Sequence, residues 1–120
     1  MNYDKNNIFA KILRGEISCK KVYENDYVLS FHDINPLKKT HVLLIPKGEY
    51  IDLDDFHNKA SEREIIEFNK AITQVVKILK ISNQEDGYRV LSNIGKNSGQ
   101  EVSHLHLHIF GGEKLGRIVL

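Results

Sequence analysis

A chain of 120 residues, 41% of them hydrophobic, is long enough for one domain with its own core, and we expect a single domain over residues 1–120. Its 17 basic and 16 acidic residues nearly balance, which argues against a nucleic-acid-binding surface and a polybasic membrane-binding patch. The one cysteine excludes an internal disulfide and a cysteine zinc cluster, and with no leader sequence or membrane-length apolar run in view we expect a cytoplasmic protein.

The first predicted element is a short helix, because apolar residues recur at helical spacing at Ile8, Phe9, Ile12 and Leu13. Gly15 follows as the residue that ends it. Two strand-like segments, 19–24 and 27–33, are separated by an Asn-Asp pair that suits a hairpin turn. Residues 40–46 predict another strand, which ends at a proline that cannot donate to a sheet ladder.

The second half of the chain begins with an acidic cluster that we interpret as a solvated turn, formed by Asp52, Asp54 and Asp55. Ser61 and Glu64 then match a capping box and begin a long helix that runs to about Lys80. Its predicted apolar face contains Ile65, Ile66, Ile72, Val75, Val76 and Leu79. Segments 87–93 and 102–110 predict strands on either side of a polar glycine loop. The expected fold class is α+β: an antiparallel sheet of about five strands with one long helix and a short N-terminal helix.

The segment HLHLHIF, residues 104–110, carries the most information about function. Successive side chains of a strand point to opposite faces, so His104, His106 and His108 are expected to share one face. The apolar residues between them are expected to pack against the core. Three alternating histidines, from only six in the chain, are unusual for an ordinary solvated strand face.

Besides that solvated face, two functional interpretations remain open on the residues alone. Two neighbouring imidazoles on a strand can share a zinc ion, but the outer pair is roughly 13 Å apart, so a third ligand such as His41 or Glu49 would be needed. Alternatively, a neutral imidazole is a nucleophile near pH 7, and its neighbours can assist it. The preceding glycine loop offers backbone amides that can hold phosphate oxygens, which favours phosphate-transfer chemistry.

In this context the segment resembles the signature of the histidine-triad (HIT) superfamily, in which three histidines alternate with apolar residues. Further stretches agree in the same order, at 8–17, 28–36, 40–47, 87–95 and 99–112. The resemblance is stronger to the Hint-like nucleoside phosphoramidases than to the dinucleoside-polyphosphate hydrolases. It implies a hydrolase of purine nucleoside phosphoramidates or related phosphate conjugates that needs no metal and no cofactor.

The resemblance assigns the nucleophile to His106, which would form a nucleotidyl-histidine intermediate. It implies that His104 and His108 bind phosphoryl oxygens or assist proton transfer, and that His41 supports the site. The expected phosphate contacts are Asn93 and the loop around Gly99, Glu101 and Val102.

The resemblance also implies a nucleoside pocket in which Asp33 accepts hydrogen bonds from both ribose hydroxyls. The apolar walls around the base are expected to be Ile8, Phe9, Ile12, Phe31, Ile34 and Leu43. The implied partners are a purine nucleotide substrate and a second copy of the chain, paired through the long helix and strand 87–93. The alternative function is a purine-nucleotide-binding regulatory or scaffold protein with little turnover.

Three departures from the family pattern bear on these expectations. Glu101 stands where some relatives have a serine near the leaving group, and Glu49 stands where many have a histidine. Together with the lone Cys19, Glu49 weakens the zinc option that some relatives show. The chain has no tryptophan, which some relatives place near the leaving group at the C-terminus.

Overall fold

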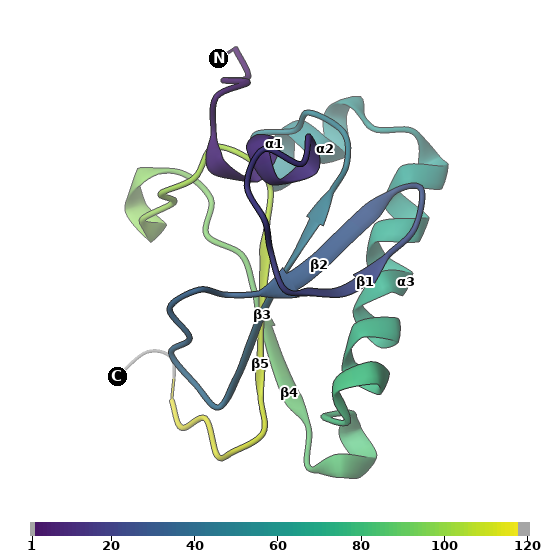
Figure 1. Ribbon diagram of the computed structural model, residues 1–120, viewed down its shortest axis with the longest axis vertical. Helices are drawn as coiled ribbons and strands as arrows, with labels where there is room; N and C mark the ends of the chain where they lie inside the picture. Colours follow the sequence, from purple (N-terminus) through teal and green to yellow (C-terminus); the bar gives the residue numbers. More distant parts are fainter. Residues whose placement is uncertain (1, 118–120) are drawn as a thin grey trace.

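The computed structural model describes residues 2–117. Five antiparallel strands form one sheet in the order β1-β2-β3-β5-β4 (Figure 1). The strands are β1 (Lys21–Glu24), β2 (Val28–His32), β3 (Thr40–Pro46), β4 (Tyr88–Leu91) and β5 (Leu107–Gly111). The expected fold class, with its long helix and short N-terminal helix, is confirmed.

Three α-helices and two short 3-10 turns complete the described chain. They are α1 (Ile8–Leu13), α2 (Leu53–Lys59), α3 (Glu62–Leu79), η1 (Asn83–Glu85) and η2 (Lys96–Ser98). Helix α3 packs along one face of the sheet, against β1, β2 and β3, and α1 lies near the opposite face (Figure 1). The histidines occupy the face that α1 partly covers.

Local hydrogen bonds explain where the predicted helices begin and end. The Ser61 hydroxyl accepts from the backbone amide of Glu64, and the Glu64 carboxylate accepts from the Ser61 amide, so the predicted capping box is confirmed. Helix α1 ends at Leu13, with Arg14 as its C-cap, and Gly15 follows with a φ of +77°. That left-handed conformation is nearly free of strain only for glycine.

Helix α2 was not expected, because its acidic residues were interpreted as a solvated turn. Asp52 is the N-cap, and its carboxylate accepts the amide of Asp55 at 2.9 Å. Asp54 and Asp55 stand in the first turn, where negative charge interacts favourably with the helix dipole. The spacing of capping acid and first-turn acids was the signal that could have revealed this helix.

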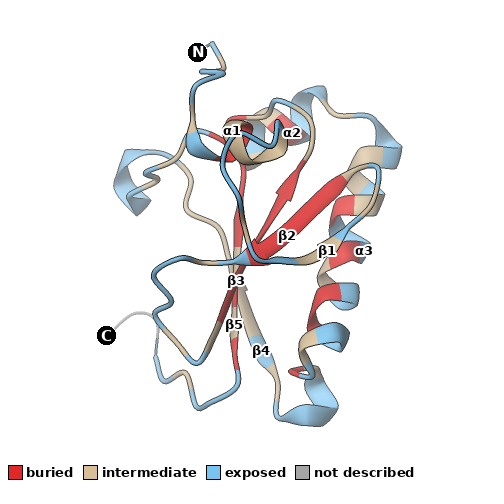
Figure 2. Cartoon of the chain, in the orientation of Figure 1, coloured by how far each residue is buried: buried red, intermediate tan, exposed pale blue. Residues whose placement is uncertain are grey.

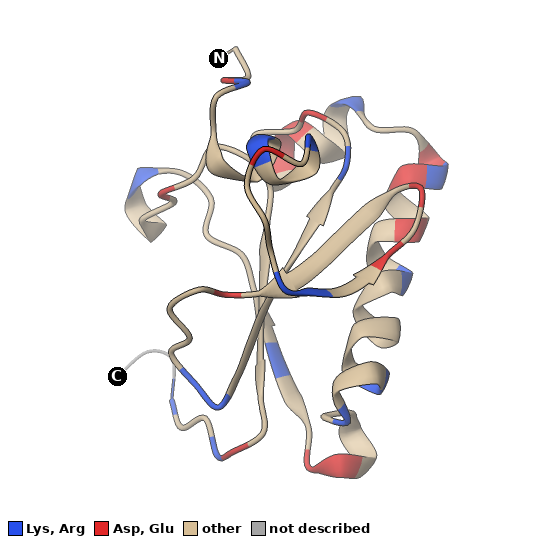
Figure 3. Cartoon of the chain, viewed as in Figure 1, with Lys and Arg blue, Asp and Glu red and all other residues tan. Residues whose placement is uncertain are grey.

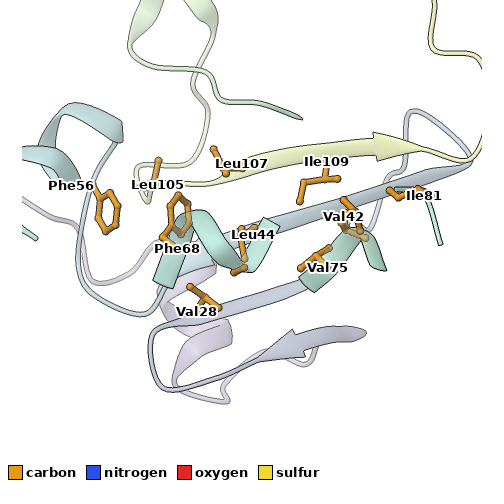
Figure 4. Close-up of a cluster of buried hydrophobic side chains, with 12 residues drawn as sticks. Val28, Val42, Leu44, Phe56, Phe68, Val75, Ile81, Leu105, Leu107 and Ile109 are labelled. Carbon is orange, nitrogen blue, oxygen red and sulfur yellow. The ribbon is translucent and has the colours of Figure 1, made fainter. Parts of the chain in front are cut away.

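The hydrophobic core has two parts, one on each face of the sheet, because β3 is buried on both sides (Figure 2). The larger part lies between α3 and the sheet, where Phe68 and Val75 of the helix meet Leu44 and Ile109 of the strands (Figure 4). The smaller part lies under α1. The expected helix face is right except at Ile66, which is 47% exposed.

Basic and acidic residues are interspersed along the described chain (Figure 3). Within residues 2–117, no helix has the length and apolar character needed to cross a membrane.

Candidate active site

The three histidines do not lie on one regular strand. Only His108 is inside β5, and His104 and His106 precede it in an irregular segment. The prediction of a strand with strict alternation through all three is therefore wrong at its start. The reason is that the backbone amide of Leu105 donates to the carbonyl of Tyr50 at 2.8 Å instead of joining a ladder of the sheet.

The ring of His106 is held by a backbone carbonyl. Its Nδ1–H donates to the carbonyl oxygen of His104 at 2.8 Å, so the lone pair of the neutral ring is on Nε2. Nε2 of His106 has no hydrogen-bond partner among residues 2–117. Every side-chain nitrogen or oxygen that is fully buried within these residues does have a partner. Although His106 is only 7% exposed, its Nε2 therefore reaches the surface. Phe9 packs edge-on against the ring, with centroids 4.9 Å apart.

His104 is completely buried, and both of its ring nitrogens are occupied. Its Nε2–H donates to the carbonyl oxygen of Pro46 at 2.9 Å, and its Nδ1 accepts a hydrogen bond from the hydroxyl of Tyr3. For His104 to bind phosphoryl oxygens or to transfer protons, as the resemblance implies, one of these bonds would have to open. The backbone carbonyl of His104 accepts the Nδ1–H of His106.

His104, His106, His108 and His41 follow one another in space, and we call them the histidine row. His41 and His108 form a hydrogen-bonded pair at one end of it. The amide of Leu37 donates to Nδ1 of His41 at 3.1 Å, which leaves the proton of the neutral His41 ring on Nε2. That Nε2–H donates to Nδ1 of His108 at 3.0 Å, and the Asp33 carboxylate lies 3.4 Å from Nε2 of His41. His108 consequently carries its own proton on Nε2, where it can donate to a ligand.

Burial keeps this row of imidazoles neutral. It lowers the pKa of His104 to about 4, despite the opposing hydrogen bond to Pro46. Burial also lowers the pKa of His108 to about 4, and the neighbouring histidines add to the effect. Burial lowers the pKa of His106 as well, although the hydrogen bond to the His104 carbonyl and, to a smaller extent, the charge of Asp33 oppose the shift. At pH 7 the lone pair of His106 is therefore available for attack on an electrophile.

A cavity of about 840 Å³ adjoins the histidine row, and most of the residues predicted to contact the nucleoside line it. Asp33 lies at one wall, and two of the apolar wall residues are open to solvent, with Ile34 90% and Ile8 45% exposed. The other predicted residues that line it are Phe9, Ile12, Phe31, His41, Leu43, Glu101 and Val102. Residues 17–20 also line the cavity, and the sequence did not indicate this segment as part of the pocket. The three triad histidines lie beyond this lining, and Phe9 bridges the cavity and His106.

The glycine loop lies between β4 and β5 and is organised by Gln100. Its side-chain oxygen accepts the amide of Gly95, and its side-chain nitrogen donates to the carbonyls of Ile51 and Val102. The amide of Gly99 donates within the loop, to Lys96, at 3.1 Å. The expected phosphate contact from Gly99 would therefore require this bond to open. Asn93 also lies outside the lining of the cavity.

One group of side chains has the spacing of a metal site. One ligand atom each from Asp33, His41 and His108 lies within 4.8 Å of the others. A histidine that binds a metal generally donates its other ring N–H to an acceptor. In His41 the other nitrogen instead accepts the amide of Leu37, so the proton stays on the nitrogen that would face the ion. This tautomer favours a hydrogen-bonded pair over a metal centre.

The comparison with protein families agrees with the sequence pattern. The profile of the HIT domain matches residues 14–115, which is most of the chain. The chain belongs to the HIT family.

Relatives and solved structures of the HIT family cover nearly the whole chain. An uncharacterised HIT-like protein of Azospirillum brasilense is 52% identical over 117 residues, which are 98% of this chain and 94% of that protein. The purine nucleoside phosphoramidase of Escherichia coli K12 is 40% identical over 110 residues, covering 91% of this chain and 89% of its own. A HIT family hydrolase from Clostridium thermocellum superposes with a TM-score of 0.86 at 35% identity, over 98% of this chain and 99% of that structure.

The HIT resemblance did not reveal every residue that holds the histidines. Tyr3, the Pro46 carbonyl, the Leu37 amide and Gln100 each make a hydrogen bond that orients the row or its loop. Two of these partners are backbone atoms, which carry no signal in the sequence. Tyr3 precedes the region of the HIT match.

Proposed function

We propose that this HIT protein hydrolyses purine nucleoside phosphoramidates or related nucleotide phosphate conjugates through a covalent intermediate on His106. The observation that supports this proposal is the orientation of one ring. Nδ1 of His106 is held by a carbonyl, and Nε2 has an open lone pair. The phosphoramidase and hydrolase names of two relatives support the same class of reaction.

In the first step, Nε2 of His106 forms a bond to the α-phosphorus while the phosphorus–nitrogen bond of the substrate breaks. The amine leaves after taking a proton from solvent. The carbonyl of His104 stabilises the positive charge that the substituted ring acquires, because it already accepts the Nδ1–H. In the second step a water oxygen attacks the same phosphorus, the water proton goes to solvent, and the electron pair returns to Nε2. The products are an amine and a nucleoside monophosphate.

The surrounding groups act as neutral donors in this mechanism. The Nε2–H of His108 donates to a phosphoryl oxygen, and its direction is fixed by the bond from His41 to Nδ1. His41 in turn keeps its tautomer through the Leu37 amide. Because these groups are protein side chains and a backbone amide, the proposed reaction requires no metal and no cofactor.

The nucleoside would bind in the cavity beside the row. Asp33 has an accessible carboxylate edge, with 19% of its side chain exposed, and could accept from two ribose hydroxyls. The apolar walls formed by Phe9, Phe31 and Leu43 suit the faces of a purine ring but offer few groups to read its edges. We therefore propose a purine preference without strict selection of one base.

The decisive experiment replaces the nucleophile and traps the intermediate. We expect His106→Ala to abolish hydrolysis of an adenosine phosphoramidate, and His57→Ala, at an exposed position of α2, to retain it. A substrate that forms the intermediate faster than water removes it should leave a nucleotidyl adduct on His106, located by mass spectrometry. Full activity in His106→Ala, or an adduct on another residue, would contradict the proposal. Tight nucleotide binding without turnover by the wild-type protein would favour the scaffold alternative.

We also propose that two copies of the chain pair through α3 and β4. Strand β4 is at one edge of the sheet, and an unpaired edge promotes association with another strand. Apolar side chains are exposed on the same two elements, with Ile66 47%, Ile78 51% and Tyr88 37% exposed. Pairing with a second copy would remove both the unpaired edge of β4 and these apolar side chains from water. Analytical ultracentrifugation should give the mass of two chains, and a single-chain mass would contradict this pairing.

A further inference from the structure

The segment before helix α1 reaches the most deeply buried histidine of the row. Tyr3 lies 101 residues before His104 in the sequence, yet its hydroxyl is hydrogen-bonded to Nδ1 of that ring. The two rings also pack edge to face, with centroids 5.6 Å apart and planes at 70°. No step of the proposed reaction uses this tyrosine.

The direction of the hydrogen bond follows from the other side of the His104 ring. The carbonyl oxygen of Pro46 can only accept, so the nitrogen 2.9 Å away from it, Nε2, carries the proton. A neutral imidazole then has a lone pair on Nδ1, and the hydroxyl of Tyr3 is the donor. Since His104 is completely buried, Tyr3 satisfies a nitrogen that water does not reach.

The segment that carries Tyr3 is tied to helix α1. The carbonyl of Asp4 accepts from the side chain of Asn7 at 2.8 Å, and Asn7 is the N-cap of the helix. The side chain of Arg14 donates to the carbonyl of Lys5 at 2.7 Å. The same N-terminal unit supplies Phe9, which packs against the ring of His106.

We propose that Tyr3 is a positioning residue of the active site, which acts through His104 to fix the tautomer and direction of the His106 ring. The bond from Tyr3 holds the His104 side chain, and the backbone carbonyl of His104 accepts the Nδ1–H of His106. This inference rests on the proposed function of His106.

The first test observes the protons directly in the wild-type protein. Long-range ¹H–¹⁵N correlation spectra distinguish protonated from unprotonated ring nitrogens. We expect His104 to be protonated on Nε2 alone, and His106 on Nδ1 alone. A proton on Nδ1 of His104 at pH 7 would overturn the proposal, since Tyr3 could not then donate to that nitrogen.

The second test removes one oxygen atom. Tyr3→Phe keeps the aromatic ring but removes the donor to His104. We expect kcat for an adenosine phosphoramidate to fall about tenfold and KM to stay within about twofold, because the cavity residues that would bind the nucleoside are unchanged. The spectra of the variant should show His106 losing its single Nδ1–H tautomer.

The matched control is Tyr23→Phe, which removes a half-buried hydroxyl that accepts from Asn25 on the α3 side of the sheet. We expect it to leave kcat and both histidine tautomers as in the wild type. If Tyr3→Phe behaves like this control while His106→Ala is inactive, the role of Tyr3 is refuted and the proposed function stands. If His106→Ala remains active, the proposed function itself fails. Should Tyr3→Phe not fold, the wild-type spectra decide the assignment.

Discussion

Acid should weaken the fold through His104, because the buried ring resists protonation. In the unfolded chain a histidine has a pKa of about 6.5, whereas burial lowers the pKa of His104 to about 4. As pH falls below 6.5, the unfolded state takes up a proton that the folded state does not yet bind, so the stability present at pH 7 is lost toward pH 4. The gap between the two pKa values, at ~1.4 kcal/mol per pH unit, gives a loss of about 3 kcal/mol from this one residue.

Urea unfolding followed by circular dichroism at several pH values between 7 and 4 measures this loss. His104→Gln removes the titrating group, so its free energy of unfolding should fall by about 3 kcal/mol less than that of the wild type over this range. His108 and the carboxylates titrate in both proteins and cancel in the difference. His57→Gln, at an exposed position of α2, is the control and should follow the wild type. Parallel curves for the wild type and His104→Gln would refute the reasoning.

Two further changes test the nucleoside pocket and the long helix. Asp33→Asn should raise KM for a ribonucleoside phosphoramidate by roughly tenfold or more, since hydrogen bonds to a charged acceptor are worth about 1.5–3 kcal/mol. Steady-state kinetics should show a much smaller change in KM for the 2′,3′-dideoxy substrate. Equal changes for the two substrates would contradict the ribose role of Asp33. Ser61→Ala removes the oxygen that caps α3 and should lower the free energy of unfolding by about 1 kcal/mol in urea titrations, whereas a loss near zero would mean that the helix does not depend on its cap.

Sequence patterns were reliable where the responsible interactions are local. The capping box joins Ser61 and Glu64 within one helical turn, and Gly15 ends α1 through its own backbone conformation. The hairpin turn likewise depends on the side chain of Asn25, whose oxygen accepts the backbone amides of Tyr27 and Val28. The same local chemistry gives Asp52 its capping role in α2, although the acidic cluster concealed that helix.

By itself, then, the sequence determined most of the elements, the family and the set of histidines, because these follow from short-range periodicity and spacing. It did not reveal α2, and it placed the start of β5 too early. Only the tertiary structure decided what each ring can do. His104 is turned into the interior and His106 keeps an open nitrogen, although alternation along a strand makes them equivalent. The proton positions depend on partners 58 residues away for His104 and 67 residues away for His108. Such contacts arise when the chain folds back on itself. Burial then keeps each imidazole neutral, and its hydrogen bonds set its direction.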